Sequence, residues 1–321
     1  MANPTISTFA RLALKTLPST SVRLDFRDFS PGVTGVKADA NMNRGELDRA
    51  VNRTRTTAVM CQPRYSGEPT ALEWSYLLPW ITGGTPTGSP LVTYPLGNTP
   101  VERKLYFDDG NGKIHVMNNV AIRSATLSTA NPERLLSCSL SCVAAQLASS
   151  GSGSTTPAYQ DTPGSDPFPT VTLDDTTPPF CLPDASGFTS LGGTTTGTIT
   201  IDSTVTTLGD FSITMDNVVP DRMFHSFYQT RNIKPDRITQ VSFAYPEGEF
   251  PSLYTDAEDG VPVFIRMVTG GYIFEIEMPA VIFPREPMEF QNRSEVVNRL
   301  NGIAYKTDAS ASVILRLDTT A

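Results

Sequence analysis

Short runs of alternating apolar and polar residues, separated by Gly, Pro, Asn and Asp, recur along this chain. The clearest pair is formed by residues 262–267 and 272–277, which are joined by the turn residues 269–271, Thr-Gly-Gly. Alternation with period two places successive side chains on opposite faces of a strand, and a glycine turn between two such runs is typical of a β-hairpin. The pattern therefore predicts a mainly β protein.

One segment has helical rather than strand periodicity. Trp74, Leu77, Leu78 and Ile81 follow the spacing i, i+3, i+4, i+7, after a Thr at position 70 that can cap a helix. We expect this helix to end at residues 83–84, Gly-Gly, with Pro79 kinking or shortening its last turn. A second short helix is expected over 252–259, and a short turn capped by Ser294 through Leu300. The remaining expected strands are 22–26, 57–62, 104–107, 113–117, 120–126, 135–144, 198–202, 211–215, 237–243, 280–283, 303–306 and 312–317.

The chain divides into four parts by composition. Residues 1–20 have the character of an N-terminal arm, 21–148 form a first β unit, and 195–321 form a second. Between them, residues 149–194 are rich in Ser, Thr, Gly and Pro and predict a flexible or surface insertion with few core residues. Both units share the order strands, short helix, hairpin and returning strands, which raises duplication as a hypothesis.

Charge is distributed unevenly along the chain. Residues 1–150 carry 15 Lys and Arg against 11 Asp and Glu, whereas residues 151–321 carry 10 against 22. No Lys or Arg occurs between Leu135 and Asp221. Because binding to a phosphate backbone depends on cations that release counterions, such a chain is not expected to wrap nucleic acid. The acidic part could be an ordinary soluble surface, or the wall of a channel that DNA passes without adhering.

The cysteines and the apolar runs bear on where the protein is made. Cys138 and Cys142 are four residues apart on an expected strand, which separates them by roughly 13 Å and prevents a disulfide. With Cys61 and Cys181 they predict four free thiols and folding in a reducing cytoplasm. No apolar run reaches the roughly 18 residues of a membrane span, and residues 1–17 lack the apolar core of a signal peptide.

Residues capable of chemistry are few and do not form known motifs. The two histidines, His115 and His225, have no neighbouring residues at metal-ligand spacing. Asp108 and Asp109 precede Gly-Asn-Gly and are best explained by turn formation. Asp256, Glu258 and Asp259 form an acidic cluster without the spacing of a calcium loop. We therefore predict no catalytic residues, no metal and no cofactor, and interpret the chain as a protein other than an enzyme.

Two acids on the best strand are candidate functional residues. Glu275 and Glu277 alternate with Phe274, Ile276 and Met278, so one face of this strand is acidic and the other apolar. The acidic face could simply be solvated. Alternatively, it could line a lumen and repel the phosphates of passing DNA.

The order of these elements, together with several short strings, resembles the tail tube proteins of long-tailed bacteriophages of the siphophage type, in particular the longer, two-part kind. The strings lie at 53–55, 61–63, 69–79, 83–84, 94–99, 118–127, 136–144, 211–218, 235–239, 278–279 and 303–305. The resemblance implies a β-sandwich or barrel flanked by a short helix. It also implies a virion protein that forms a homo-oligomeric ring, either a hexamer or a trimer with pseudo-sixfold symmetry. These rings would stack with other tail proteins into a conduit for DNA ejection, after assembly in the host cytoplasm and without a membrane partner.

Two other functions fit parts of the sequence. The chain could be another virion component, such as a neck, tail completion or decoration protein. It could also be a carbohydrate-binding β domain, since Trp74, Trp80 and several tyrosines could stack on sugars. Both tryptophans lie on the expected helix, where core packing explains them better.

Overall fold

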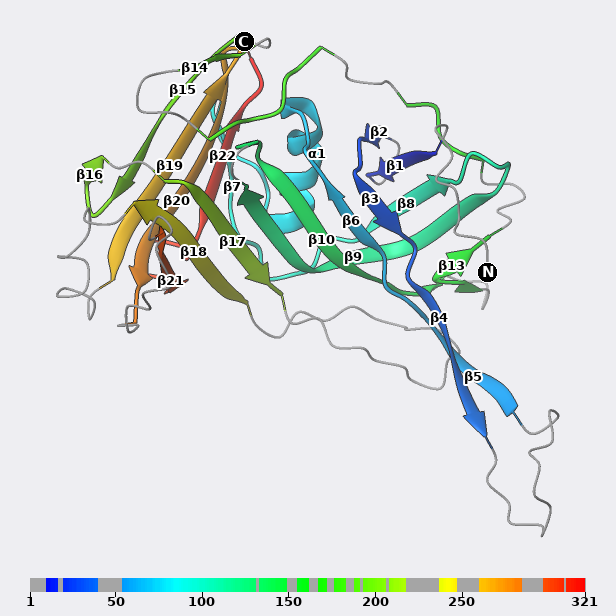
Figure 1. The fold of residues 1–321 in the computed structure, drawn as a ribbon. Coiled ribbons are helices and arrows are strands. Elements are labelled where there is room, and N and C mark those ends of the chain that lie inside the picture. The colour runs from blue at the N-terminus through cyan, green and yellow to red at the C-terminus, as the bar shows by residue number, and fades with distance from the viewer. Residues whose placement is uncertain are drawn as a thin grey trace.

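The structure is a computed structural model, and it describes residues 10–16, 20–39, 54–130, 133–148, 155–161, 167–171, 176–182, 188–190, 193–205, 208–217, 237–246, 260–284, 297–308 and 310–320. These residues form 22 strands and one helix, which confirms the predicted mainly β fold. Eighteen of the strands are connected into one bent, antiparallel sheet (Figure 1). We describe this sheet as two parts, sheet I and sheet II.

Sheet I contains seven strands whose inner residues are apolar. In spatial order they are β3 (Asp28–Ser30), β6 (Arg64–Gly67), β10 (Ser137–Ala144), β9 (Ile114–Thr129), β17 (Asp210–Asp216), β18 (Ile238–Pro246) and β21 (Val297–Ala304). Burial alternates along them, as the pattern of Phe211, Ile213 and Met215 in β17 illustrates. One face of sheet I therefore packs on the core and the other is open.

Sheet II is built around the predicted hairpin. Its central strands are β15 (Gly193–Ile201), β19 (Val261–Thr269), β20 (Tyr272–Ile282), β22 (Ile314–Asp318) and β7 (Val92–Tyr94), with β14 (Phe188–Ser190) and β16 (Thr204–Val205) beside β15. The end of β20 also pairs with β21, where Val281 lies opposite Ala304. This pairing makes the two sheets continuous.

The first strands extend sheet I along the first half of β9. β1 (Arg11–Lys15) lies between β2 (Ser21–Leu24) and β8 (Arg103–Asp108), and β8 pairs with β9. Leu12, Ala13 and Leu14 are fully buried. Within the expected arm over 1–20, the described residues 11–15 are therefore an internal strand whose apolar side chains need the partner β8, far away in sequence.

The helix α1 (Ala71–Thr82) forms as predicted and lies between the two sheets (Figure 1). Thr70 accepts from the Glu73 amide, and the Glu73 carboxylate accepts from the Thr70 amide at 2.8 Å, which is a capping box. Gly83 ends the helix with φ 78°, a conformation that glycine adopts without a Cβ penalty. Pro79 is accommodated within the helix.

A cation that directly precedes the distant strand β18 stabilises the carboxyl end of α1. Arg237 donates to the Thr82 carbonyl at 3.1 Å and to Asn217 Oδ1 at 2.9 Å. Positive charge is favourable at this end of the helix dipole. Burial lowers the pKa of Arg237 to about 10. The contact therefore links α1 to the strands β17 and β18.

Core residues from both expected β units form one cluster. It includes Trp74 and Leu127 from 21–148, and Phe274 and Leu315 from 195–321. Strands of the two units also pair directly, β9 with β17 and β7 with β22. The second expected helix, over 252–259, lies outside the described residues. Residues 297–300, expected in a turn, are strand residues of β21.

The insertion 149–194 contributes more to the core than predicted. Its short strand β13 (Tyr159–Gln160) pairs with β9, and Phe180 is fully buried with its ring centroid 5.4 Å from that of Phe274. A further short strand, β12 (Thr155–Thr156), pairs with β11 (Leu147–Ala148). Sequence reasoning missed these anchors because isolated apolar residues in a Ser/Thr/Pro-rich stretch have no periodicity.

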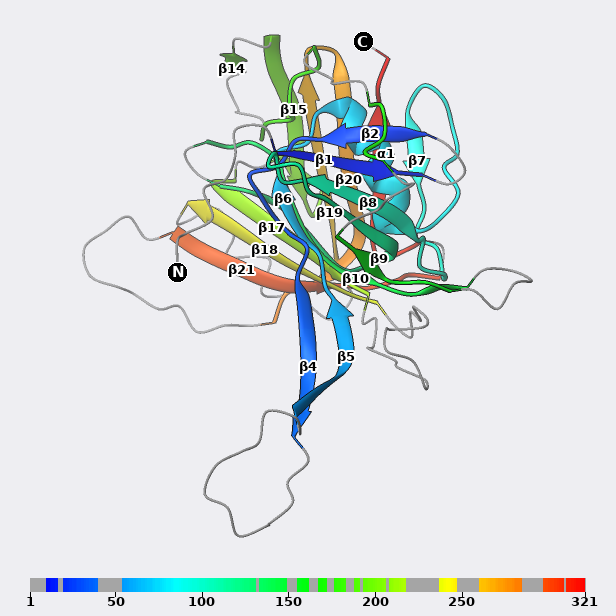
Figure 2. The same ribbon diagram turned by 90° about the vertical axis from the view of Figure 1, so that its right-hand side faces the viewer.

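One strand pair lies apart from both sheets. β4 (Val33–Asp39) and β5 (Thr54–Cys61) form a separate two-stranded ribbon that projects from the body (Figure 2). Its base is fixed by Val33 opposite Cys61, next to sheet I. We refer to β4 and β5 as the ribbon.

We expect Thr70→Ala to lower the free energy of unfolding by about 1 kcal/mol, because it removes the side-chain acceptor of the α1 capping box. Thr70→Ser retains this acceptor and is the matched control. Urea unfolding followed by circular dichroism measures both. Equal midpoints for the two variants would contradict the role assigned to the cap.

Candidate functional surfaces

The two acids predicted from sequence lie on the outer face of sheet II, each beside an arginine. Glu275 lies between Arg266 on β19 and Arg316 on β22, at 3.4 Å and 3.5 Å. Glu277 accepts from Arg316 at 2.6 Å. We call these four residues the ion-pair ladder.

The ion-pair ladder reduces both the exposure and the net negative charge of the two acids. The Glu275 residue is only 5% exposed although it belongs to an outer face, because the flanking arginines cover it. Two arginines balance the two carboxylates. Their predicted place in a lumen stays a prediction, but within the subunit they are not bare negative charges.

The outer face of sheet I has a different chemistry. Ser66, Ser139, Thr126 and Thr214 lie side by side across β6, β10, β9 and β17. A parallel row across β10, β9, β17 and β18 contains Ser137, Ser128, Ser212 and Ser242. All eight side chains are half-buried or exposed. We call these two rows, with Ser124 and Ser141 beside them, the hydroxyl face.

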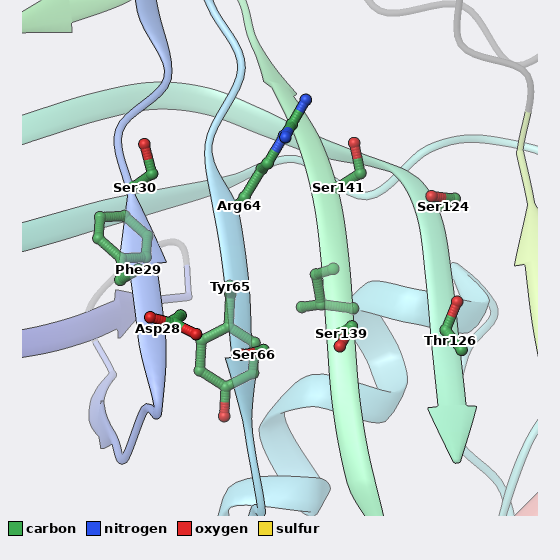
Figure 3. A pocket seen from close by; sticks show the side chains of 11 residues that line it. Asp28, Phe29, Ser30, Arg64, Tyr65, Ser66, Ser124, Thr126, Ser139 and Ser141 are labelled. Carbon is green, nitrogen blue, oxygen red and sulfur yellow. The ribbon is translucent and has the colours of Figure 1, made fainter.

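The hydroxyl face includes a shallow hollow of about 430 Å³. Figure 3 shows its side chains, with Ser139 and Ser141 on β10, Ser124 and Thr126 on β9, and Arg64 at one end. The hollow forms because the hydroxyl side chains are short and leave the bent sheet uncovered. Sequence reasoning missed this surface, since the alternating serines of β10 show only that one face is polar.

Few charges interrupt the hydroxyl face. β10 and β18 contain no charged residue, and neither does β9 from Ser124 to Thr129. Some hydroxyls bond to one another across strands, such as Thr126 to Thr214 at 3.0 Å and Ser128 to Ser137 at 3.0 Å. Charged residues stand around the two rows. Asp28 and Arg64 lie near the β3 edge, Asp216 lies on β17 opposite Ser124, and Asp210 lies with Arg299 near the β21 edge.

An apolar patch adjoins the hydroxyl face at the β21 edge. Ile238, Ile303 and Tyr305 are 44%, 38% and 46% exposed. Ile303 lies opposite Gln240 on β18, two residues from Ile238. Large exposed apolar side chains in one place are typical of a surface that another protein covers.

The remaining reactive groups have structural roles. His115 Nδ1 lies 2.6 Å from the Tyr159 hydroxyl and the two rings stack, which holds β13 on β9. Asp108 and Asp109 accept from the backbone amides of Gly110 and Asn111 at 2.9 Å and 2.8 Å, which confirms the predicted turn chemistry. Hydrogen bonds from the backbone amides of Asn111 and Lys113 lower the pKa of Asp109.

No group of metal-ligating side chains was found within the described residues. His225 and the acidic cluster at Asp256, Glu258 and Asp259 lie outside them. Trp74 and Trp80 are buried, and the Trp80 indole donates to the Val120 carbonyl at 3.0 Å, as expected for core residues. They therefore offer no aromatic platform for a sugar.

All four cysteines are free thiols, as predicted. Burial raises the pKa of Cys61 to about 12 and also raises the pKa values of Cys138 and Cys142. Partial burial raises the pKa of Cys181, and the positive charge of Arg134 offsets part of this rise. Thiolate is the reactive form, so these thiols are poor nucleophiles at neutral pH.

We expect one thiol per folded chain to react readily with Ellman's reagent at pH 8, and all four to react in denaturant. The ready thiol is Cys181, which alone among the four is not buried. Its rate should continue to rise above pH 8.5, since its pKa is raised. Cys181→Ser should abolish the fast phase, and a fast phase that survives this substitution would contradict the assignment.

The described helix is too short and too polar to be a candidate membrane span. No known family model matches the sequence. A search of curated proteins likewise gave no significant match.

Proposed function

We propose that this chain is the subunit of a bacteriophage tail tube, in which copies form rings and the rings stack into a conduit for DNA. We assign the two parts of the sheet, with α1 between them, to the tail-tube type of β-sandwich or barrel. The protein acts by self-assembly within the virion rather than by catalysis. Its partners are further copies, other tail proteins and the DNA that passes through.

The ribbon carries this proposal. An isolated two-stranded hairpin is at best marginally stable in water, yet β4 and β5 extend from the body without a third strand among the described residues. Unpaired strand edges also invite pairing with other chains. A neighbouring copy that receives the ribbon would supply the missing contacts. The exposed patch of Ile238, Ile303 and Tyr305 offers a second contact between copies.

A ring is the simplest product of such contacts. The ribbon and the patch are different surfaces, so contacts made through them are heterologous, and heterologous contacts generate rings or filaments. A tube of stacked rings contains both, because each ring is closed and the stack of rings is a filament. A decoration protein, in contrast, needs only one contact surface toward its capsid or tail.

Negative-stain electron microscopy of the purified full chain tests the proposal. We expect rings or tubes with a central channel at high protein concentration, or on addition of other tail components. A chain that remains monomeric under both conditions, as measured by light scattering, would contradict it.

A further inference from the structure

We propose that the hydroxyl face is the surface presented to DNA in the lumen, in place of the acids predicted from sequence. This inference rests on the proposed tube. Two observations lead to it: the predicted acids are paired with arginines in the ion-pair ladder, and the two rows of the hydroxyl face contain no charged residue.

The hydroxyl face is poorly suited to be a contact between subunits. The cores of protein interfaces are enriched in aromatic residues and arginine and depleted in serine. This face has short hydroxyl side chains and, toward its β3 edge, a hollow of about 430 Å³ that a flat partner would leave unfilled. Exposed apolar residues gather instead at the β21 edge, with Ile303 and Tyr305. The apolar β21 edge is therefore the better contact for a neighbouring subunit, and the two hydroxyl rows are the better surface for contact with solvent.

The same chemistry suits a polyanion that must pass and not bind. Each cation that contacts a phosphate adds affinity by releasing counterions, and strands β10 and β18 offer none. Hydroxyls hold water and can exchange hydrogen bonds with phosphate oxygens, but they carry no charge. Pairs such as Thr126–Thr214 already satisfy each other at 3.0 Å, which further weakens their hold on a ligand. The face is thus wettable and weakly adhesive.

The cations nearest to the hydroxyl face lie at its margins. Arg64 lies at the end of the hollow, on β6, with Asp28 on the adjacent strand β3 (Figure 3). Arg299, near the other edge, is paired with Asp210 at 3.3 Å. Positive charge therefore lies at the margins of this face, and the two rows themselves contain no charged residue.

Thiol labelling of assembled tubes tests the position of the hydroxyl face. Ser139→Cys is made in a Cys181→Ser background, so that the remaining native thiols are buried. Intact tubes are incubated with biotin-maleimide, which is small enough to enter the open ends, and then with streptavidin–gold. We expect biotin on the chain after denaturation but no gold along the tube walls. Free subunits of the same variant should bind streptavidin, and Thr126→Cys is the second position.

Each other result has a distinct meaning. Gold along the walls would place the hydroxyl face outside and overturn the inference. Absence of biotin from intact tubes would place it in a subunit contact and also overturn it. Failure of the unaltered chain to form any tube would contradict the proposed function itself.

A variant that adds a positive charge to the hydroxyl face tests whether DNA meets this face. Ser139→Arg should make tubes retain duplex DNA fragments in a nuclease-resistant form at low salt, and the retention should fall as salt rises. Ser139→Gln, which adds length without charge, is the matched control and should retain no more than the unaltered tube. Equal retention by the Arg and Gln variants would show that DNA does not meet this face.

Discussion

Replacing Trp74 with alanine is expected to lower the free energy of unfolding by about 3–5 kcal/mol, the usual cost of removing a large buried aromatic side chain. Trp74 is fully buried in α1, and its ring centroid lies 5.0 Å from that of Phe274 in sheet II. The substitution would open a cavity between the helix and this sheet. Urea unfolding followed by circular dichroism measures the loss.

Trp74→Phe provides the matched control. The indole Nε1 of Trp74 is buried and has no hydrogen-bond partner among the residues that the structure describes, so phenylalanine removes an unsatisfied donor while it keeps most of the ring. We expect a loss below about 1.5 kcal/mol for this variant. A similar loss for Trp74→Ala and Trp74→Phe would show that the ring does not fill the core as described.

Removing most of the ribbon is expected to abolish tube formation and leave the subunit folded. Val36 and Ala58 are partners in the ribbon, so an Asn-Gly turn can join them directly in place of residues 37–57. The remaining short hairpin retains its base at Val33 and Cys61. Electron microscopy measures assembly, and thermal unfolding confirms that the body is intact.

A second variant distinguishes the contribution of the ribbon strands to assembly from that of the segment between them. Joining Asp39 to Thr54 by Asn-Gly removes residues 40–53 and keeps both strands. If the strands make the contact, this variant assembles and the shorter one does not. Normal tubes from the shorter variant would contradict the role proposed for the ribbon.

Local signals allowed the hairpin and the helix to be predicted. The apolar alternation of 262–267 and 272–277, with glycines between, specifies β19 and β20 without help from the rest of the chain. Thr70 and Gly83 mark the ends of α1 through contacts within a few residues. Both elements are determined by interactions between residues that are close together in the sequence.

Non-local contacts explain what could not be predicted. Glu275 faces Arg316 only because β22 pairs with β20, and nothing in the strand 272–277 indicates this partner. Likewise, 113–117 and 120–126 were expected as two strands and form one, β9, with Asn119 in the left-handed region at φ 47° where the register with β8 shifts. The hydroxyl face arises only when five strands from both expected β units align their serines and threonines.

The place of β22 in sheet II has a consequence for synthesis. Tyr94 pairs with Leu315, so β7 stays without its neighbour until almost all of the described chain has left the ribosome. Contacts of such long sequence separation form late and slow folding. Until then the edge of β20 that pairs with β22 is unpaired, and unpaired strand edges are prone to aggregation. The same delay keeps sheet II unfinished until almost all of the described chain has been made.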